Sequence, residues 1–570
     1  MKSVTNLKNL AVIIGTAGMV SACNNTNSNI SGEEYSQLEM PNILWISLED
    51  LSPRIGCYGD TLAKTPVVDR LADEGIRFTH VFTSAPVCAP CRSGIITGME
   101  QSAIGTHHMR TSQVADGLPG PYQAVPPAYV KTFTEYLRAA GYYCTNNVKT
   151  DYQFTPPVTA WDENSPRASF INRKDKSQPF FAVFNFTDTH ESKCWSKPEF
   201  TNPDLVEVPP YYPDTPAVRE NIAKVYDNIM SVDKKIGELL KVLEESGEAD
   251  NTIVFFWTDH GDGLPRAKRW LYESGLRVPL IVKYPDRRYA GTTDDRLISS
   301  IDFGPTTLSL AGIEVPAHMQ GRAFLGKYAE VEERDFVFAA RDRFDLSYDM
   351  VRAIRTEQFR YIRNYYPHQP YIVWVPYRNR MPIMQELIRL NLEDSLNAVQ
   401  KLWMADNRPV EELYDCEKDP HNIHNLAGDP AFKHIVQEMR VTMDNYMDEI
   451  NDMGRIPEDQ MVEMFWPGGV QPETYKPKFI IDSSSDFERL VAIETEVIPY
   501  PCEIKLQCPT NGASIAYTLE TGVNPSWKLY TGPVPLEPGE HLMRAKAIRI
   551  GYKESEEVNQ LFSVTGRLGS

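Results

Sequence analysis

Three nearly continuous apolar runs constrain the fold of this chain more than any other feature. They cover residues 42–48, 179–186 and 252–258, and polar residues follow each of them. Runs of this length are typical of central strands that are covered on both faces of a sheet. Helical patterns lie between and around them, at 64–75, 130–141 and 219–247. Strands that alternate with helices predict an α/β domain with a layered central sheet.

Acidic and histidine side chains follow two of these predicted strands directly. Glu49 and Asp50 end the first run, and Asp259 and His260 end the third. Ligands gather at the carboxyl ends of strands in open α/β sheets, and carboxylates suit Ca²⁺ or Mg²⁺. Imidazole is a less typical ligand of such hard ions. We therefore expect a divalent metal site with these four residues as ligands; the alternative is a solvated acidic loop.

A cysteine-containing stretch at 87–98 predicts the start of a helix. Pro90 suits a first helical turn, and the free N–H groups of a helix N-terminus would favour anionic chemistry at Cys88. Cys88 and Cys91 also form a Cys-x-x-Cys pair, which indicates the alternative of a redox or metal site. A thioredoxin-like motif should begin the helix of a small redox domain, whereas here Arg92 follows and the spacing continues to a Thr-Gly pair at 97–98.

The same stretch resembles the signature of type I sulfatases, Cys-x-Pro-Ser/Ala-Arg followed by Thr-Gly. The resemblance implies an α/β fold like that of alkaline phosphatase, with a central mixed sheet flanked by helices and a smaller α+β C-terminal subdomain. It implies that a sulfatase-maturating enzyme oxidises Cys88 to formylglycine, whose hydrate attacks sulfur. It also implies one bound Ca²⁺, with the modified Cys88 among its ligands. Cys91 departs from the family pattern, which has Ser or Ala at that position, and this bears on the efficiency of conversion.

The resemblance assigns further catalytic residues. Lys149 lies where sulfatases carry the Lys of a Gly-Lys-Trp-His segment, and Lys268 matches the Lys of Lys-Gly-Thr-Thr-Tyr-Glu. With Arg92, these cations are expected to surround the sulfonyl oxygens; the alternative is that the lysines are solvated surface groups. His190 is the expected general acid, because an ordinary pKa of about 6.5 lets it give a proton near neutrality. It also matches the His that follows the buried strand in sulfatases. Its alternative role is to cap a strand end, which would leave Lys268 as the acid.

Other positions depart from the sulfatase pattern. Glu49 replaces an Asp, His260 replaces the usual amide, and Asp151 stands where the family has His. With Cys91, these departures favour an alternative function, a glycan-binding lipoprotein with an inactive catalytic fold. A second alternative is a phosphodiesterase or phosphoryl transferase, but such enzymes generally use Thr or Ser as nucleophile and often two metals.

His107 and His108 follow the signature helix. We expect them to bind the sugar of the substrate; the alternative is that they are polar loop residues.

The N-terminus predicts export. An apolar run at 10–20 follows Lys2 and Lys8, and it is too short to span a bilayer. Residues 1–23 are therefore expected to be a signal peptide, with Cys23 in a lipoprotein cleavage box and 24–39 as a polar tether. This predicts a lipid-anchored periplasmic or cell-surface protein of a bacterial envelope; an ordinary secretory signal is the alternative. The net charge of −19 disfavours nucleic acid as a partner.

A chain of 570 residues is too long for one compact core. We expect a catalytic core at 40–345 and a C-terminal subdomain at 346–470, with strands at 352–365 and 370–375. Short β-like segments separated by turns predict a small β-sandwich at 478–570, which resembles the sandwich appended to chitobiases. Together with the resemblance to carbohydrate sulfatases, this module indicates a Ca²⁺-dependent sulfatase that acts on sulfated glycans.

Overall fold

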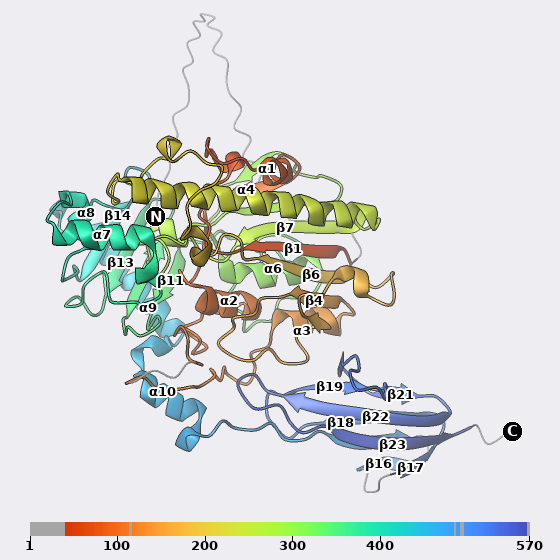
Figure 1. Ribbon diagram of the computed structural model, residues 1–570. Helices are drawn as coiled ribbons and strands as arrows, with labels where there is room; N and C mark the ends of the chain where they lie inside the picture. Colours follow the sequence, from red (N-terminus) through yellow and green to blue (C-terminus); the bar gives the residue numbers. More distant parts are fainter. Residues whose placement is uncertain (1–39, 113–116, 484–485, 491–494, 567–570) are drawn as a thin grey trace, which may run out of the picture.

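The computed structural model describes residues 40–112, 117–483, 486–490 and 495–566 (Figure 1). The predicted signal peptide, the lipidation site Cys23 and the tether lie outside the described residues. Within the described ranges, no helix has both the length and the apolar character that crossing a membrane requires.

An eight-stranded mixed sheet forms the centre of the largest unit (Figure 1). In spatial order its strands are β5 (Glu163–Asn164), β4 (Tyr143–Asn147), β6 (Phe180–Phe186), β1 (Asn42–Leu48), β7 (Thr252–Thr258), β8 (Leu280–Lys283), β2 (Ile76–Phe78) and β9 (Thr292–Asp294). The strands from β5 to β7 are parallel, whereas β8 is antiparallel to both of its neighbours. The three predicted apolar strands are confirmed as β6, β1 and β7, which lie side by side. Their carboxyl ends therefore meet at one edge.

Helices cover both faces of this sheet (Figure 1). On one face lie α1 (Pro66–Asp73), α4 (Pro216–Glu245) and α7 (Pro382–Leu392); on the other lie α2 (Cys88–Thr97), α3 (Phe133–Ala139) and α6 (Phe303–Leu310). The long predicted helix is confirmed as α4, which begins three residues earlier than expected. It starts there because Thr215 caps it and Pro216 tolerates the first helical position.

A second, antiparallel sheet stands beside the core. Its order is β11 (Val337–Arg341), β12 (Val351–Arg355), β13 (Phe359–Asn364) and β14 (Glu411–Asp415). Helix α9 (Lys433–Glu449) packs on it through Val436, Met439 and Met443. The smaller helices of this region and its surroundings are α5 (Glu273–Leu276), α8 (Ala398–Trp403) and α10 (Glu458–Phe465), and a short pair, β3 (Val81–Phe82) and β10 (Ile298–Ser299), completes the core.

The strand expected at 352–365 is a hairpin, β12 and β13, and the strand expected at 370–375 is wrong. The place beside β13 is taken by β14, which pairs along its whole length. Tyr371 instead packs its ring against Trp270 and Trp403, at centroid distances of 5.4 and 5.7 Å. Tyr371 and Val375 are thus buried by side-chain packing without a strand ladder, whereas Trp374 is exposed.

The C-terminal segment forms two facing sheets, as the turn-rich pattern predicted. One contains β16 (Asp486–Leu490), β15 (Lys478–Ser483), β18 (Cys502–Gln507) and β21 (Val534–Leu536); the other contains β17 (Thr495–Pro499), β23 (Val558–Thr565), β22 (Gly539–Ile548), β19 (Ser514–Thr518) and β20 (Lys528–Leu529). Their shared core includes Phe479, Ile504, Met543 and Phe562. This module touches the core domain, since Lys131 Nζ donates to Gly512 O at 2.6 Å.

Candidate active site

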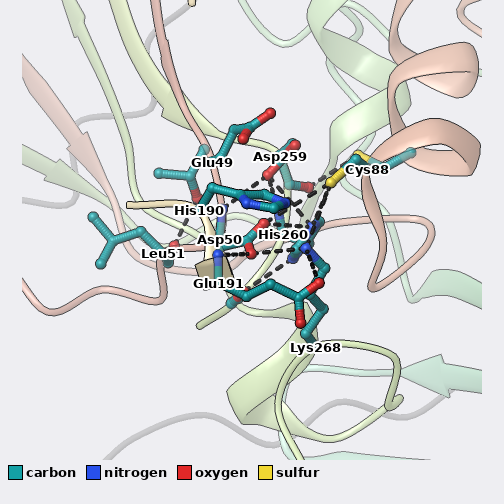
Figure 2. Close-up of polar contacts among 12 residues, drawn as sticks. Glu49, Asp50, Leu51, Cys88, His190, Glu191, Asp259, His260 and Lys268 are labelled. Carbon is teal, nitrogen blue, oxygen red and sulfur yellow. Dashed lines mark hydrogen bonds and ion pairs between the residues drawn. The ribbon is translucent and has the colours of Figure 1, made fainter. Parts of the chain in front are cut away.

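Side chains from four segments converge at the carboxyl ends of β6, β1 and β7 (Figure 2). Glu49 and Asp50 follow β1, His190 and Glu191 follow β6, and Asp259 and His260 follow β7. The N-terminus of α2 brings Cys88, and Lys268 comes from the loop beyond β7. All of these side chains except His190 are almost completely buried. The strand-end positions singled out in the sequence are therefore neighbours in space.

Cys88 is the first residue of α2, after an extended Val87. Its Sγ lies 3.3 Å from His260 Nε2, 3.9 Å from Asp50 Oδ1 and 3.8 Å from Lys268 Nζ. The helix N-terminus and Lys268 both favour negative charge at this position. The residue thus presents its reactive atom to both the acidic cluster and a cation.

The geometry of His260 indicates a cation site. Its Nδ1 lies 3.0 Å from Gly261 O, so this nitrogen carries a proton and Nε2 faces the cluster. Nε2 lies 3.1 Å from Asp50 Oδ1 and 3.7 Å from Asp259 Oδ1. Three lone-pair atoms in this arrangement repel one another unless a second ring proton or a metal ion lies between them.

The electrostatics of these side chains agree with this interpretation. Burial lowers the pKa of His260, but Asp259 and Asp50 outweigh burial and raise that pKa well above its ordinary value. Burial raises the pKa of Asp50, but Lys268 and His260 outweigh it and hold that pKa well below the usual range. A proton on His260 thus supplies positive charge between the carboxylates, as a bound divalent cation would. Two groups of donors that share residue 88 fit such an ion: Asp50 with His190, and Asp259 with His260.

Hydrogen bonds hold both carboxylates in place. Asp50 Oδ2 accepts from Glu191 N and from Lys268 Nζ, each at 2.7 Å. Asp259 Oδ1 accepts from two backbone N–H groups, and its Oδ2 accepts from Arg92 Nε at 3.0 Å. Such outer-shell partners orient metal ligands before an ion arrives.

Glu49 lies at this site with its carboxylate paired to Lys149, and its expected role as a metal ligand stays a prediction. Lys149 also lies 3.3 Å from Asp151 Oδ2. Burial lowers the pKa of Lys149, but Cys88, Glu49 and Asp151 together outweigh burial and raise that pKa above the ordinary value. The predicted ligand Glu49 therefore serves here as the partner of a predicted catalytic cation.

Lys268 bridges two acids, Asp50 at 2.7 Å and Glu191 at 3.1 Å. Burial lowers its pKa, but Asp50 outweighs burial and raises the pKa well above normal. Such a Lys keeps its proton, which makes it a poor general acid.

His190 lies at the rim of the cluster and is half-buried. One of its ring nitrogens lies within 4.8 Å of ligand atoms of Asp50 and Cys88. Its Nδ1 accepts from Ser192 N, so the neutral ring carries its proton at Nε2. Burial lowers the pKa of His190 below its ordinary value. The residue both caps the turn after β6 and faces the cluster, so the two roles considered for it are compatible.

Three residues of the site escaped the sequence analysis. Glu191 forms a bidentate pair with Arg269, both contacts at 3.0 Å, and Asn185 Oδ1 accepts from Arg92 Nη1 at 2.9 Å. Glu191 and Arg269 directly follow predicted site residues, and Asn185 is a polar residue inside an apolar strand. Each of these was a usable signal.

Cys91 faces away from Cys88. Its Sγ donates to Asp259 O at 2.9 Å and accepts from Thr83 Oγ1 at 2.9 Å. Burial raises its pKa to about 12. Both cysteines are free. Cys91 is therefore a packed residue beneath the loop that carries Asp259.

His107 and His108 are only 1% and 5% exposed. Their rings lie 4.2 Å apart, and Arg343 N donates to His108 Nδ1. Among the described residues, no hydrogen bond or ion pair joins either ring to the Cys88 cluster. Their expected contact with sugar stays a prediction.

Comparisons with known proteins place the chain in a family. The sulfatase family model matches residues 41–156 and 165–313, and the model of the N-sulphoglucosamine sulphohydrolase C-terminal region matches 265–377. The chain is 41% identical to an ulvan-active sulfatase of Formosa agariphila, over 93% of both chains. It is 26% identical to human N-sulphoglucosamine sulphohydrolase, over 72% of this chain and 90% of that one.

A solved 2-O GAG sulfatase has the same fold, with a TM-score of 0.53 at 20% identity over 73% of this chain and 94% of that one. The chain thus belongs to the sulfatase family, whose members are sulfuric ester hydrolases.

Proposed function

We propose that this protein removes sulfate from sulfated glycans or polysaccharides, with formylglycine at position 88 and one bound Ca²⁺. The observation that carries the proposal is the position of residue 88 at the N-terminus of α2, 3.3 Å from His260 Nε2 and 3.8 Å from Lys268 Nζ. The 41% identical relative is described as active on ulvan, which supports a polysaccharide substrate.

The residues of the site fit the needs of sulfate-ester cleavage. Arg92, Lys149 and Lys268 supply positive charge for the sulfonyl oxygens, where negative charge develops in the transition state. Formylglycine would supply the attacking oxygen, and Ca²⁺ would supply further positive charge beside the ester. Asp50 and Asp259 offset the positive charges of Lys268 and Arg92. His190 Nε2–H gives a proton to the departing alcohol.

We also propose that the protein is exported and anchored through lipid on Cys23. The support is the pattern of residues 1–23, together with a substrate class that is found outside cells. A sulfatase-maturating enzyme and the membrane would then be its partners. The boundaries 40–345, 346–470 and 478–570 remain our proposal for its domains.

Turnover by converted protein tests the proposed function. Protein made with a sulfatase-maturating enzyme should hydrolyse 4-nitrophenyl sulfate and release sulfate from at least one member of a panel of sulfated oligosaccharides. Arg92→Lys keeps the charge but loses the fork that joins Asp259 and Asn185, so its turnover should fall. Faster hydrolysis of 4-nitrophenyl phosphate than of the sulfate would favour the phosphoryl-transfer alternative. Tight glycan binding by converted protein without sulfate release would favour the inactive binding protein.

A further inference from the structure

Donor atoms of Cys88, Asp259 and His260 lie within 4.8 Å of one another at the active site, and Asp50 Oδ1 contacts two of these residues. Cys88 Sγ is 3.3 Å from His260 Nε2 and 3.9 Å from Asp50 Oδ1. His260 Nε2 is 3.1 Å from Asp50 Oδ1 and 3.7 Å from Asp259 Oδ1. Zinc bonds of about 2.0–2.3 Å at tetrahedral angles place neighbouring ligand atoms about 3.3–3.6 Å apart. These four distances, 3.1–3.9 Å, bracket the values expected between zinc ligands.

The second shell of this cluster also matches that of a transition-metal site. His260 Nδ1 lies 3.0 Å from a backbone carbonyl, the contact that directs the other ring nitrogen at a metal. Both carboxylates are held by backbone N–H groups and by a cation each, Lys268 for Asp50 and Arg92 for Asp259. Three of the four ligand side chains are 0–1% exposed and Cys88 is 2% exposed, so water competes little for the ion.

The chemistry of residue 88 decides which ion this cluster prefers. A thiolate and an imidazole are the ligands of borderline ions such as Zn²⁺, whereas oxygen ligands suit Ca²⁺. Conversion of Cys88 replaces the sulfur donor by oxygen. The same pocket therefore changes its metal preference when its cysteine is modified.

We propose that the folded chain with unconverted Cys88 is a Zn²⁺-binding protein, which holds the ion through Cys88 Sγ, His260 Nε2, Asp50 and Asp259. On binding, Cys88 Sγ–H loses its proton to solvent and an S–Zn bond forms, while no oxidation state changes. Any proton on His260 Nε2 leaves in the same way. The zinc form is catalytically silent, because it lacks the formylglycine that would supply the attacking oxygen. This inference rests on the unmodified residues and does not depend on the substrate proposed above.

Cobalt provides a direct readout of sulfur ligation. Protein made without a maturating enzyme is checked by mass for an intact Cys88 thiol, stripped with a chelator and titrated with Co²⁺. We expect a thiolate-to-cobalt charge-transfer band in the near ultraviolet, loss of that band on addition of Zn²⁺, and no loss with excess Ca²⁺. Calorimetry in buffers of different ionisation enthalpy should show proton release.

Variants separate the two cysteines. Cys88→Ser should lose the band and bind Zn²⁺ at least about a hundredfold more weakly, since even outer-shell changes cost 10–100-fold. His260→Asn should keep the band and also weaken Zn²⁺ binding. Cys91→Ser should change neither quantity, because its sulfur faces Asp259 O and Thr83. Fully converted wild-type protein has the native fold without the thiol and should give no band.

Two outcomes overturn the inference: no charge-transfer band in folded, unconverted protein, or a band that persists in Cys88→Ser or in converted protein. Neither outcome bears on sulfatase turnover, which is measured on converted protein. Conversely, a converted protein that fails to cleave sulfate esters leaves the zinc result intact.

Discussion

Cys88 Sγ lies 3.3 Å from His260 Nε2, and the two residues come from the N-terminus of α2 and the end of β7. This contact joins the residue that resembles a sulfatase nucleophile to a residue that departs from the sulfatase pattern. An amide at position 260 could only offer oxygen to a cation, whereas imidazole offers nitrogen. The site thus combines a family-like nucleophile position with a donor set that includes an imidazole.

His190→Ala should slow cleavage of sugar sulfates by about 10²–10⁴-fold, the usual contribution of a general acid. Cleavage of 4-nitrophenyl sulfate should fall far less, because an acidic phenol departs without a proton. Steady-state kcat/KM on both substrates measures the difference. Ser192→Ala is a matched control, because it keeps the ring and removes only its side-chain partner at 2.9 Å. Equal losses on both substrates in His190→Ala would assign the residue to binding or structure.

Removal of the metal should abolish activity, because a bound cation would offset the electrostatic repulsion among Asp50, Asp259 and His260. We expect a chelator to inactivate converted protein and Ca²⁺ to restore it. Asp259→Asn should mimic this loss, because it removes one negative charge while the amide oxygen can still accept from the N–H groups of Asp50 and His260. Recovery with Zn²⁺ and not with Ca²⁺ would show that the calcium assignment is wrong.

Much of this arrangement follows from local sequence rules. The runs that became β1, β6 and β7 are largely apolar because both sheet faces are covered, and parallel pairing brings their ends together. This is why Asp50, Asp259 and His260 could be grouped without a structure. The signature helix was also recognisable, because Pro90 suits its first turn.

Contacts between side chains distant in sequence could not be predicted in this way. Glu49 has the residue type of a metal ligand, and its carboxylate pairs with Lys149. The order and pairing of strands alone do not reveal this contact. Segment 370–375 has strand-like composition, yet β14 occupies the adjacent sheet edge. Burial of His107 and His108 likewise depends on Arg343 and on packing of the second sheet.

Acid should destabilise the fold through Glu273, which links the core to the second sheet. Its Oε1 accepts from Arg360 Nη2 at 2.6 Å and Arg355 Nε at 2.8 Å. Burial raises the pKa of Glu273, but the two arginines outweigh it and lower the pKa to about 2, from an ordinary 4.5. A carboxyl whose pKa is lower in the folded than in the unfolded chain stabilises the folded state at pH values above the unfolded pKa. That contribution is lost as pH falls from about 4.5 to 2.

The predicted size of this contribution is roughly 3 kcal/mol at neutral pH. Glu273→Gln should lower the free energy of unfolding by an amount of that order and flatten its dependence on pH between 4.5 and 2. Denaturant titrations across this range measure both. Glu393→Gln, which removes an exposed carboxylate paired with Arg389, is the control and should leave the pH dependence unchanged. A variant Glu273→Gln with the wild-type pH profile would contradict the linkage.

Cys23→Ala should release the protein from the membrane fraction and leave sulfatase activity intact. The reason is that lipid on this cysteine would be the anchor, while the catalytic cluster lies elsewhere in the chain. Fractionation with activity assays on both fractions provides the measurement. Unchanged membrane association of the variant would show that anchoring does not depend on Cys23.

The central claim is that residue 88 acts as an aldehyde and that Cys91 stays a packed thiol. The most direct measurement is mass spectrometry of the peptide that spans 84–92, from protein made with a sulfatase-maturating enzyme, together with turnover of the same sample. We predict an aldehyde at Cys88 and an intact thiol at Cys91, with activity kept in Cys91→Ser and abolished in Cys88→Ala. A fully active protein whose Cys88 remains a thiol, or is joined to Cys91 in a disulfide, would contradict the account.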